Sequence, residues 1–264
     1  MKTCICTVIK DEQEYLEDWI KYHLEFGIDK IFILEDIDST SHKYITDKYI
    51  DNVELYTYDK FGFTEKQKQL TLLNTLLKYL KSLKEFDWCF VIDADEYITL
   101  ENENDKLTDI LDLFKDHNEV VIFWKNFGTN GHIHKPDYSK VNSYREYYTK
   151  ECDYSNFDKH CNVINKLIVN LNKEFSPKCN FHHHYPCSNY IKTNFGKDIR
   201  EPIFDKIYLK HYITKSLEEY IWKLKVRGMF FPKHRKIKDL FEMEPDLLKY
   251  KLEIEKQLKI NIEK

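Results

Sequence analysis

The sequence predicts an α/β fold, in which a mostly parallel central sheet carries helices on both faces. The first observation is that short β-prone runs alternate with helical stretches along the first 100 residues. Strand, helix and strand in succession favour parallel strands joined by crossover helices. The second observation is that acidic residues stand directly behind several of these runs, where a parallel sheet binds its ligands. The four runs are Cys4–Ile9, Ile31–Leu34, Val53–Tyr58 and Trp88–Ile92.

The helices are predicted from apolar spacing and from end signals. Apolar residues recur every three or four positions within Leu16–Leu24 and again within Leu70–Leu80, which indicates two amphipathic helices. The D-x-x-E spacing at positions 11–14 is typical of a capping box and predicts the start of the first helix. Gly27 predicts its end, because glycine readily adopts the left-handed conformation that closes a helix.

The chain is expected to form one main domain over residues 1–244, followed by a helical tail at 245–264. Within the domain, residues 1–100 have the pattern of a Rossmann-like nucleotide-binding half. Residues 101–244 form an acceptor-side half of loops and antiparallel strands, with a helix at Leu107–Lys115 and a strand at Val120–Trp124.

Composition argues against nucleic-acid binding, a membrane-spanning segment and secretion. The 41 Lys and Arg against 45 Asp and Glu give a net charge of -4, so no global basic field attracts nucleic acid. No run approaches the roughly 20 apolar residues that span a bilayer, and the first residues lack the pattern of a signal peptide. Seven cysteines, an odd number spread along the chain, fit reduced thiols. We therefore expect a cytoplasmic protein, or one peripheral at a membrane.

The segment Phe90–Ile98, FVIDADEYI, carries three acids behind an apolar run. On an extended chain Asp93 and Asp95 point to the same side, where their mutual repulsion favours a hard divalent cation, Mn²⁺ or Mg²⁺. Such a cation touching a diphosphate would neutralise a leaving group. Glu96 points the other way and is expected to accept a hydrogen bond that fixes the turn. The alternative is a solvated acidic turn without a ligand.

The chain resembles glycosyltransferase family 92 and its bacterial relatives grouped near family 2, which have the GT-A fold. The resemblance covers most of the chain between Cys4 and Met229, in blocks that keep the family's order. The matching blocks are ICTVIKDEQEYLEDWIKYHLEFGIDKIFILEDIDST, QLTLLN, DWCFVIDADEYI, FWKNFGTNGH, NKLIVN, HHHY and LKHYITKSLEEYIWKLKVRG. It implies transfer of a hexosyl unit from a nucleotide-sugar, a UDP-sugar in particular, to a glycan hydroxyl with inversion.

The resemblance also implies roles for individual residues. Thr7 matches the residue at the end of the first strand in the nucleotide pocket, and Asp36 matches the acid that contacts the base. Asp93 and Asp95 match the D-x-D motif, in which the first acid lies near the ribose and the second carries the metal. His211 resembles the late histidine that completes the metal site, with Asp93 as a further candidate ligand. Imidazole suits manganese as a ligand.

Five further residues in or beside matching blocks are assigned to the donor and acceptor cleft: Gln69, His132, Lys166, His183 and Arg227. Gln69 is expected to contact the donor, His132 to be a polar contact on a glycine-containing loop, and His183 to line the cleft. Lys166 and Arg227 are candidates to bind the diphosphate. For the loop around His132, a plain tight turn is the alternative.

Three segments allow other interpretations or depart from the family. The histidine and cysteine cluster at 179–187 lacks the paired spacing of a closed zinc site, so a cleft lining or an exposed loop is preferred to zinc. In the loop after the second strand, Asp38 stands before Ser-Thr and the family's Asn is missing. Thr129 and Asn130 stand where relatives have Ser-Ser before the glycine and histidine, which suggests a different acceptor preference.

The catalytic base is not identified by the sequence. An inverting transferase needs a carboxylate that accepts the proton of the acceptor hydroxyl. Glu219 stands three residues after Ser216, where a capping box explains it. Glu146, Asp153 and Asp158 remain equal candidates.

Three other functions compete with this interpretation. A haloacid-dehalogenase-like phosphatase also places D-x-D after a strand, but there the motif opens the domain, and Tyr97 stands where such enzymes carry Thr or Val. A sugar nucleotidyltransferase needs a glycine-rich loop after the first strand, and positions 8–11 contain no glycine. A non-catalytic carbohydrate-binding or scaffold protein of the same fold remains the alternative from another class.

Overall fold

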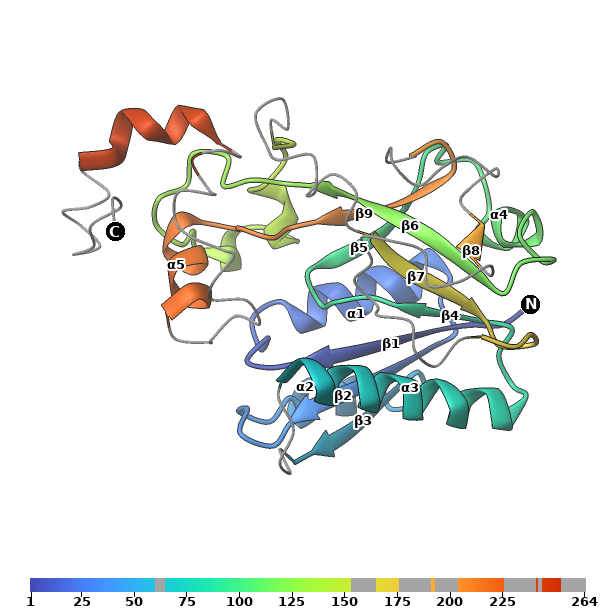
Figure 1. Ribbon diagram of the computed structural model, residues 1–264. Coiled ribbons are helices and arrows are strands. Elements are labelled where there is room, and N and C mark those ends of the chain that lie inside the picture. Colours follow the sequence, from blue (N-terminus) through green and yellow to red (C-terminus); the bar gives the residue numbers. More distant parts are fainter. Residues whose placement is uncertain are drawn as a thin grey trace. The chain divides into compact units, whose positions relative to one another are not determined.

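The computed structural model in Figure 1 describes two compact units of the chain. The first comprises residues 1–124 and 163–209, and the second residues 125–162 and 210–264. The described residues are 1–59, 65–152, 165–175, 191–192, 204–225, 241 and 244–252. Side chains at 65–69, 191–192, 224–225 and 250 are outside this description.

One sheet collects the strands, in the order β3-β2-β1-β4-β7-β6-β9-β5, with β8 paired to β6. The strands are β1 (Thr3–Ile9), β2 (Lys30–Asp36), β3 (Val53–Tyr58), β4 (Trp88–Val91), β5 (Glu96–Leu100), β6 (Glu119–Asn126), β7 (Asn165–Asn170), β8 (Ile191–Lys192) and β9 (Ile207–His211). The helices are α1 (Leu16–Phe26), α2 (Lys43–Thr46), α3 (Glu65–Leu83), α4 (Leu107–Asp112) and α5 (Leu217–Lys225). Short 3-10 helices are η1 (Asp47–Tyr49), η2 (Tyr138–Lys140), η3 (Tyr144–Glu146) and η6 (Pro245–Tyr250).

The predicted α/β class is confirmed, and the first four strands form a parallel block. β1 pairs in parallel with both β2 and β4, and β2 pairs in parallel with β3. The sheet as a whole is mixed, because β7 enters antiparallel between β4 and β6. The carboxyl ends of β1, β2 and β4 therefore meet at one edge of the sheet, as the sequence predicted.

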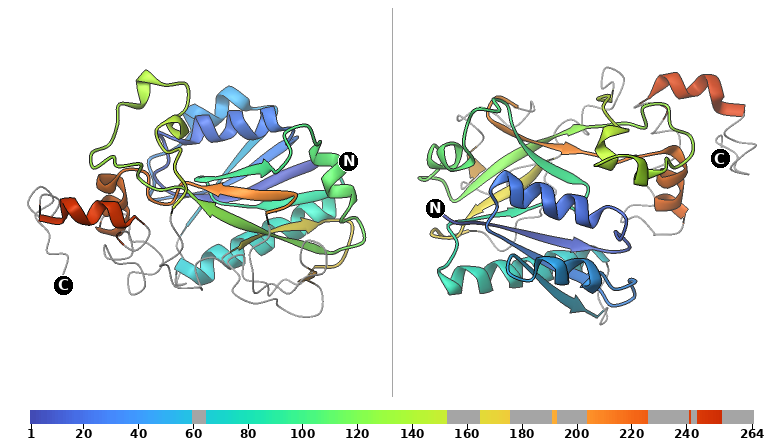
Figure 2. Two further views of the ribbon diagram at one scale, coloured as in Figure 1. Left: turned by 90° about the horizontal axis from the view of Figure 1, so that it is seen from above. Right: turned by 180° about the vertical axis from the view of Figure 1, so that it is seen from behind.

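Helices cover both faces of the parallel strands, with α1 and α3 on opposite sides (Figure 2). Side chains of a strand alternate between the faces, so Cys4 and Cys6 of β1 point the same way. Both belong to one buried cluster with Leu73, Leu77 and Leu80 of α3. The apolar spacing of α3 is thus explained by the sheet face that it covers.

The start of α1 differs from the predicted capping box. The helix begins at Leu16, and no side chain caps it. Asp11 has a positive φ of 54°, and its amide donates to Ser39 Oγ at 3.0 Å. This tertiary contact holds Asp11 in a turn and outweighs the local helix-start signal. The predicted end is correct, since Gly27 closes α1 with φ 106°.

In the second unit, the capping box that begins α5 is confirmed. Ser216 Oγ donates to Glu219 Oε2 at 2.6 Å, and the Glu219 amide donates to Ser216 Oγ at 3.2 Å. Glu219 Oε2 also accepts from the hydroxyls of Tyr138 at 2.7 Å and Tyr148 at 3.1 Å. The carboxylate therefore ties the start of α5 to the η2 region, which agrees with its predicted structural role.

In the segment expected to be a helical tail, Pro245–Tyr250 form a 3-10 helix, and the described residues continue to Leu252. Leu247 is buried, and the neighbouring Asp246 accepts from Lys150 of the same unit at 3.3 Å. Within the described part of the chain, no helix has the length and apolar character needed to cross a membrane.

Candidate functional site

The acidic turn between β4 and β5 is closed by its own hydrogen bonds. The Asp93 amide donates to Glu96 Oε2 at 2.9 Å, and the Glu96 amide donates to the Asp93 carbonyl at 3.1 Å. The Trp19 indole of α1 donates to the Glu96 carbonyl at 2.8 Å. Glu96 is fully buried, whereas Asp93 and Asp95 are half-buried. The prediction that Glu96 accepts a hydrogen bond that fixes the turn is confirmed. The prediction that Asp93 and Asp95 point to one side assumed an extended chain, whereas the chain turns at Ala94 and Asp95.

Lys166 meets this turn from β7. Because β7 runs antiparallel to β4 with Leu167 opposite Val91, Lys166 lies level with the residues that follow β4. Its Nζ is 2.7 Å from Asp93 Oδ2 and 3.5 Å from Glu96 Oε1, and its side chain is 2% exposed. The ammonium is therefore an interior ion-pair partner of the acidic turn. Its predicted contact with a diphosphate stays a prediction.

The ionisation of these groups follows from burial and from each other's charge. Burial raises the pKa of Glu96 well above its ordinary value, and Lys166 acts in the opposite direction. Burial alone would lower the pKa of Lys166, but the carboxylates of Asp93 and Glu96 outweigh it, so that this pKa is raised. Lys166 is thus held as a cation by the turn.

Thr7 and Asp36 lie near the carboxyl ends of the neighbouring strands β1 and β2. Thr7 Oγ1 is buried and has no hydrogen-bond partner among the described residues. Asp36 is 1% exposed; its Oδ1 accepts from the Asp38 amide at 3.0 Å, and its Oδ2 is 3.7 Å from Lys10 Nζ. A buried hydroxyl without a protein partner fits a ligand contact. The nucleotide contacts assigned to both residues stay predictions.

A buried glutamate–histidine pair, which the sequence analysis did not identify, braces the loops at this edge. Glu35 Oε2 lies 2.6 Å from His42 Nδ1 and also accepts from the His42 amide at 2.6 Å. The Glu12 amide donates to His42 Nε2 at 3.0 Å. The loop after β2, which follows directly on Asp36, is thereby joined to the loop after β1. No spacing rule connects residues 12, 35 and 42 before the fold is known.

His211 ends β9 and belongs to the second unit. Its Nδ1 lies 2.7 Å from Asn126 Oδ1, and both side chains are 4% exposed. An amide oxygen only accepts hydrogen bonds, so Nδ1 carries the hydrogen, and in the neutral imidazole the lone pair is then on Nε2. This is the arrangement in which a metal-binding histidine is oriented by a partner at its other nitrogen. Asn126 was missed as an individual residue, although it lies in the matching block FWKNFGTNGH.

The loop before His132 is a tight turn, as the alternative interpretation held. Asn130 and Gly131 both have positive φ, 52° and 83°, and the His132 amide donates to the Thr129 carbonyl at 2.9 Å. The half-buried His132 ring packs edge-on against the rings of Tyr147 and Tyr148. The predicted polar contact of His132 with a ligand stays a prediction.

Glu244 stabilises this loop through hydrogen bonds to its carboxylate. Its carboxylate accepts from the Thr129 amide at 2.6 Å and from Thr129 Oγ1 at 2.7 Å. A Cβ on Gly128 would lie 2.5 Å from Glu244 Oε1. Glycine at 128 therefore lets the carboxylate approach the backbone.

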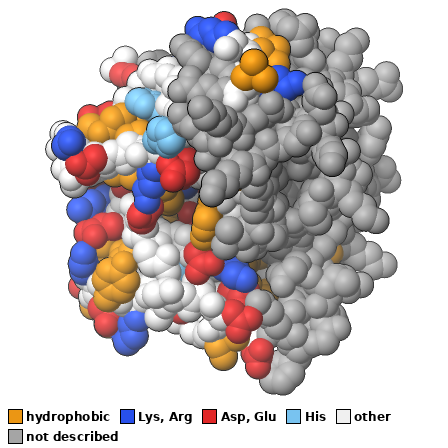
Figure 3. All heavy atoms as spheres, turned by 90° about the vertical axis from the view of Figure 1, so that its left-hand side faces the viewer, with side chains coloured by type: hydrophobic (Ala, Val, Ile, Leu, Met, Phe, Trp, Pro, Cys, Tyr) orange, Lys and Arg blue, Asp and Glu red, His pale blue; other side chains and the backbone are white. Residues whose placement is uncertain are grey.

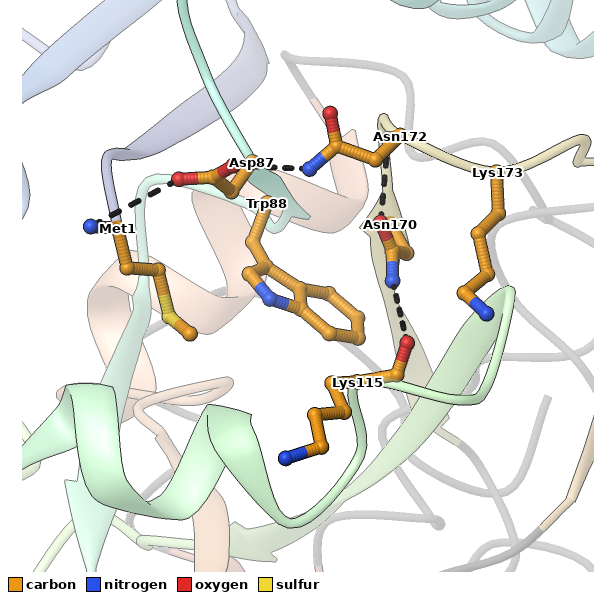
Figure 4. A pocket seen from close by; sticks show the side chains of 7 residues that line it. All are labelled: Met1, Asp87, Trp88, Lys115, Asn170, Asn172 and Lys173. Atoms are coloured by element: carbon orange, nitrogen blue, oxygen red, sulfur yellow. Dashed lines mark hydrogen bonds and ion pairs between the residues drawn. The ribbon is translucent and has the colours of Figure 1, made fainter.

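A cavity of about 470 Å³ lies at the other edge of the sheet, where β1 and β4 begin and β7 ends (Figure 4). Its polar side chains are used by the protein itself. Asn172 Nδ2 donates to Asp87 Oδ1 at 2.8 Å, and Asn170 Nδ2 donates to the carbonyls of Lys115 and His117 at 3.2 and 3.1 Å. Because these amides brace the strand ends, the acidic edge is the better candidate site.

Several predicted site residues lie outside the described part of the chain: the Gln69 side chain, His183, Arg227, the 179–187 cluster, Asp153 and Asp158. Glu146 is exposed in η3. Among the described side chains in Figure 3, acidic and basic groups are intermixed, in keeping with the net charge of -4.

Comparison with known proteins identifies similar chains. The family model described as glycosyltransferase family 92 matches residues 1–249. Glycosyltransferase family 92 protein RCOM_0530710 of Ricinus communis is 26% identical over 141 residues, which is 50% of this chain and 24% of that relative. The chain thus spans about a quarter of the length of this curated relative.

Two solved structures are also similar in part. S. aureus TarS (residues 1–349) gives a TM-score of 0.42 at 13% identity, covering 100% of this chain and 76% of that one. HddC from Yersinia pseudotuberculosis gives a TM-score of 0.41 at 10% identity, covering 84% and 97%.

Proposed function

Because the chain belongs to glycosyltransferase family 92, we propose that it transfers a hexosyl unit from a nucleotide-sugar, a UDP-sugar, to a glycan hydroxyl with inversion. The observation that supports this most directly is the acidic turn at the carboxyl edge of the parallel strands. Asp93 and Asp95 follow β4 there, and β4 pairs with β1, which contains Thr7. Parallel sheets bind nucleotides at this edge.

In this proposal Asp36 and Thr7 bind the base, and Asp93 accepts from the ribose. A carboxylate is an acceptor-only group, which suits the N–H of uracil and the hydroxyls of ribose. The Asp36 carboxylate already meets one backbone amide and the Lys10 ammonium, so its position is fixed before the nucleotide arrives. Preorganised acceptors reduce the entropy lost on binding.

The donor set suits a divalent cation of the manganese type. Asp95 offers a carboxylate oxygen, and the Asn126 contact leaves Nε2 of His211 with its lone pair. Oxygen ligands alone suit Mg²⁺, whereas an added imidazole favours Mn²⁺. When bound, the cation would neutralise charge on the departing diphosphate.

The transfer itself breaks the bond between the anomeric carbon and the diphosphate oxygen and forms a bond to the acceptor oxygen. Attack from the face opposite the leaving group inverts the anomeric centre. The acceptor proton passes to a carboxylate base. Glu219 is a poor base, because its Oε2 already accepts from Ser216, Tyr138 and Tyr148. Glu146 is the remaining candidate within the described residues.

The proposal is tested by UDP binding and by Mn²⁺-dependent hydrolysis of a panel of UDP-sugars. We expect calorimetric UDP binding that strengthens with Mn²⁺, and hydrolysis that EDTA abolishes. Asp95→Ala should abolish hydrolysis without lowering the melting temperature, while Asp116→Asn, an exposed carboxylate of the same unit, should behave as wild type. Absence of both UDP binding and hydrolysis would leave a non-catalytic role. Full activity of Asp95→Ala would remove the metal-ligand assignment.

A further inference from the structure

The acidic turn contains a cation of its own, the ammonium of Lys166. Lysine is rarely buried unless it is paired, and here the side chain is 2% exposed. Three acids, Asp93, Asp95 and Glu96, stand within four residues, and Lys166 contacts the first and the last of them at 2.7 and 3.5 Å. Trp124 adds an aromatic ring 5.9 Å from the same nitrogen. Of these two contacts, the one with Asp93 is the shorter.

The position of Lys166 is imposed by the sheet. β7 pairs with β4 on one side and β6 on the other, and Lys166 is opposite Ile122 of β6. The register places the backbone of Lys166 level with the turn. Burial and the two carboxylate contacts hold its ammonium there.

We propose that Lys166 acts as a protein-supplied cation that holds Asp93 as an ion-pair partner instead of a metal ligand, so that the turn binds one divalent cation and not two. The inference rests on the proposed function, because it concerns the metal site of the same turn. It removes Asp93 from the ligand set and keeps Asp95. Lys166 is then a positioning residue, which acts on substrate only through Asp93.

The effect of the Lys166 charge on cation affinity distinguishes this role from a purely structural one. Apart from Asp95, the turn carries two carboxylates and one ammonium. Replacing Lys166 with methionine, a neutral side chain of similar length, removes the ammonium. The carboxylates are then no longer compensated and attract a cation more strongly. A lysine that only supports the fold would affect stability when replaced, but it would not raise the affinity for a cation.

The experiment is a Mn²⁺ titration by calorimetry and electron paramagnetic resonance, with no sugar nucleotide present. Wild type should bind one Mn²⁺ per chain. Lys166→Met should bind the first Mn²⁺ about tenfold more tightly, or bind two, as expected when one unit charge is removed a few ångström away. Lys166→Arg should keep the wild-type stoichiometry. Lys106→Met, which removes an exposed lysine of the same unit, should leave the affinity unchanged.

A second comparison applies if Lys166→Met does not fold. Asp93→Asn should bind Mn²⁺ about tenfold more weakly than wild type, and adding Lys166→Met should restore the affinity, because that double variant has the charge of wild type. Unchanged or weaker binding by a folded Lys166→Met, or no recovery in the double variant, would overturn the inference alone. If wild type binds neither Mn²⁺ nor Mg²⁺, the proposed metal site is wrong and this inference fails with it.

Discussion

Asn126 Oδ1 accepts a hydrogen bond from His211 Nδ1 at 2.7 Å, between two buried side chains. The bond determines which ring nitrogen carries the proton and therefore which one is available as a ligand. It also fixes the plane of the imidazole. Histidines that bind a metal are oriented in this way by a partner at the other ring nitrogen.

Asn126→Ala is expected to weaken Mn²⁺ binding by about 10- to 100-fold, the usual cost of losing the partner that orients a metal-binding histidine. Asn126→Asp keeps an acceptor at Nδ1 and should retain most of the affinity. The measurement is a Mn²⁺ titration of the folded protein. Asn142→Ala, at an exposed position of the same unit, is the control. Wild-type affinity in Asn126→Ala would show that His211 needs no such partner.

The parts of the fold set by local signals were predictable from the sequence. β3 has the predicted bounds, Gly27 ends α1, and Ser216 with Glu219 forms the capping box of α5. In each case the deciding interactions lie within a few residues, so periodicity and capping rules apply. Asp11 shows the converse, because its conformation depends on Ser39 far along the chain.

The candidate site was predictable in its acids and not in their partners. Asp93, Asp95 and Glu96 adjoin one another directly after β4, so the sequence alone places all three at the end of that strand. Their directions were not predictable, because the chain turns at Ala94 and Asp95 and Lys166 contacts both Asp93 and Glu96. Lys166 reaches Asp93 only because β7 pairs antiparallel with β4. Asn126 likewise meets His211 across 85 positions. Such pairings depend on strand order and register, which one sequence does not specify.

Glu244 and Gly128 should show coupled effects on stability. Glu244→Ala removes the acceptor of the buried Thr129 amide and hydroxyl, and should lower the free energy of unfolding by about 1 to 3 kcal/mol. Gly128→Ala should also destabilise, because its Cβ would lie 2.5 Å from Glu244 Oε1. In the Glu244→Ala background, Gly128→Ala should add little further cost. Urea unfolding of the four proteins gives the cycle, and additive costs would contradict the predicted clash.

The pH dependence of stability should carry a contribution from Glu244. Burial raises its pKa above the ordinary value of 4.5, while Thr129 and Lys150 act to lower it and Asp246 to raise it. The folded state thus holds this proton to higher pH than the unfolded state. The stabilising contribution is complete below pH 4.5 and is lost as pH rises through the folded-state pKa.

Glu244→Gln cannot titrate, so the difference in unfolding free energy between wild type and this variant isolates the effect. The free energy of unfolding of wild type should decrease relative to that of Glu244→Gln as pH increases from about 4 to about 8. Urea unfolding at several pH values measures it, and contributions of all other groups cancel to first order. A difference that rises with pH would mean that the hydrogen bonds from Thr129 outweigh burial and lower the pKa of Glu244.

His42→Ala tests the brace between the loops after β1 and β2. The substitution leaves the buried Glu35 carboxylate without its imidazole and the Glu12 amide without its acceptor, which should cost about 1 to 3 kcal/mol in unfolding free energy. If Asp36 binds the base, its loosened loop should also weaken UDP binding. His117→Ala, a half-buried histidine at the other edge of the sheet, should leave UDP affinity unchanged. Lower stability with unaltered UDP affinity would separate the brace from the nucleotide pocket.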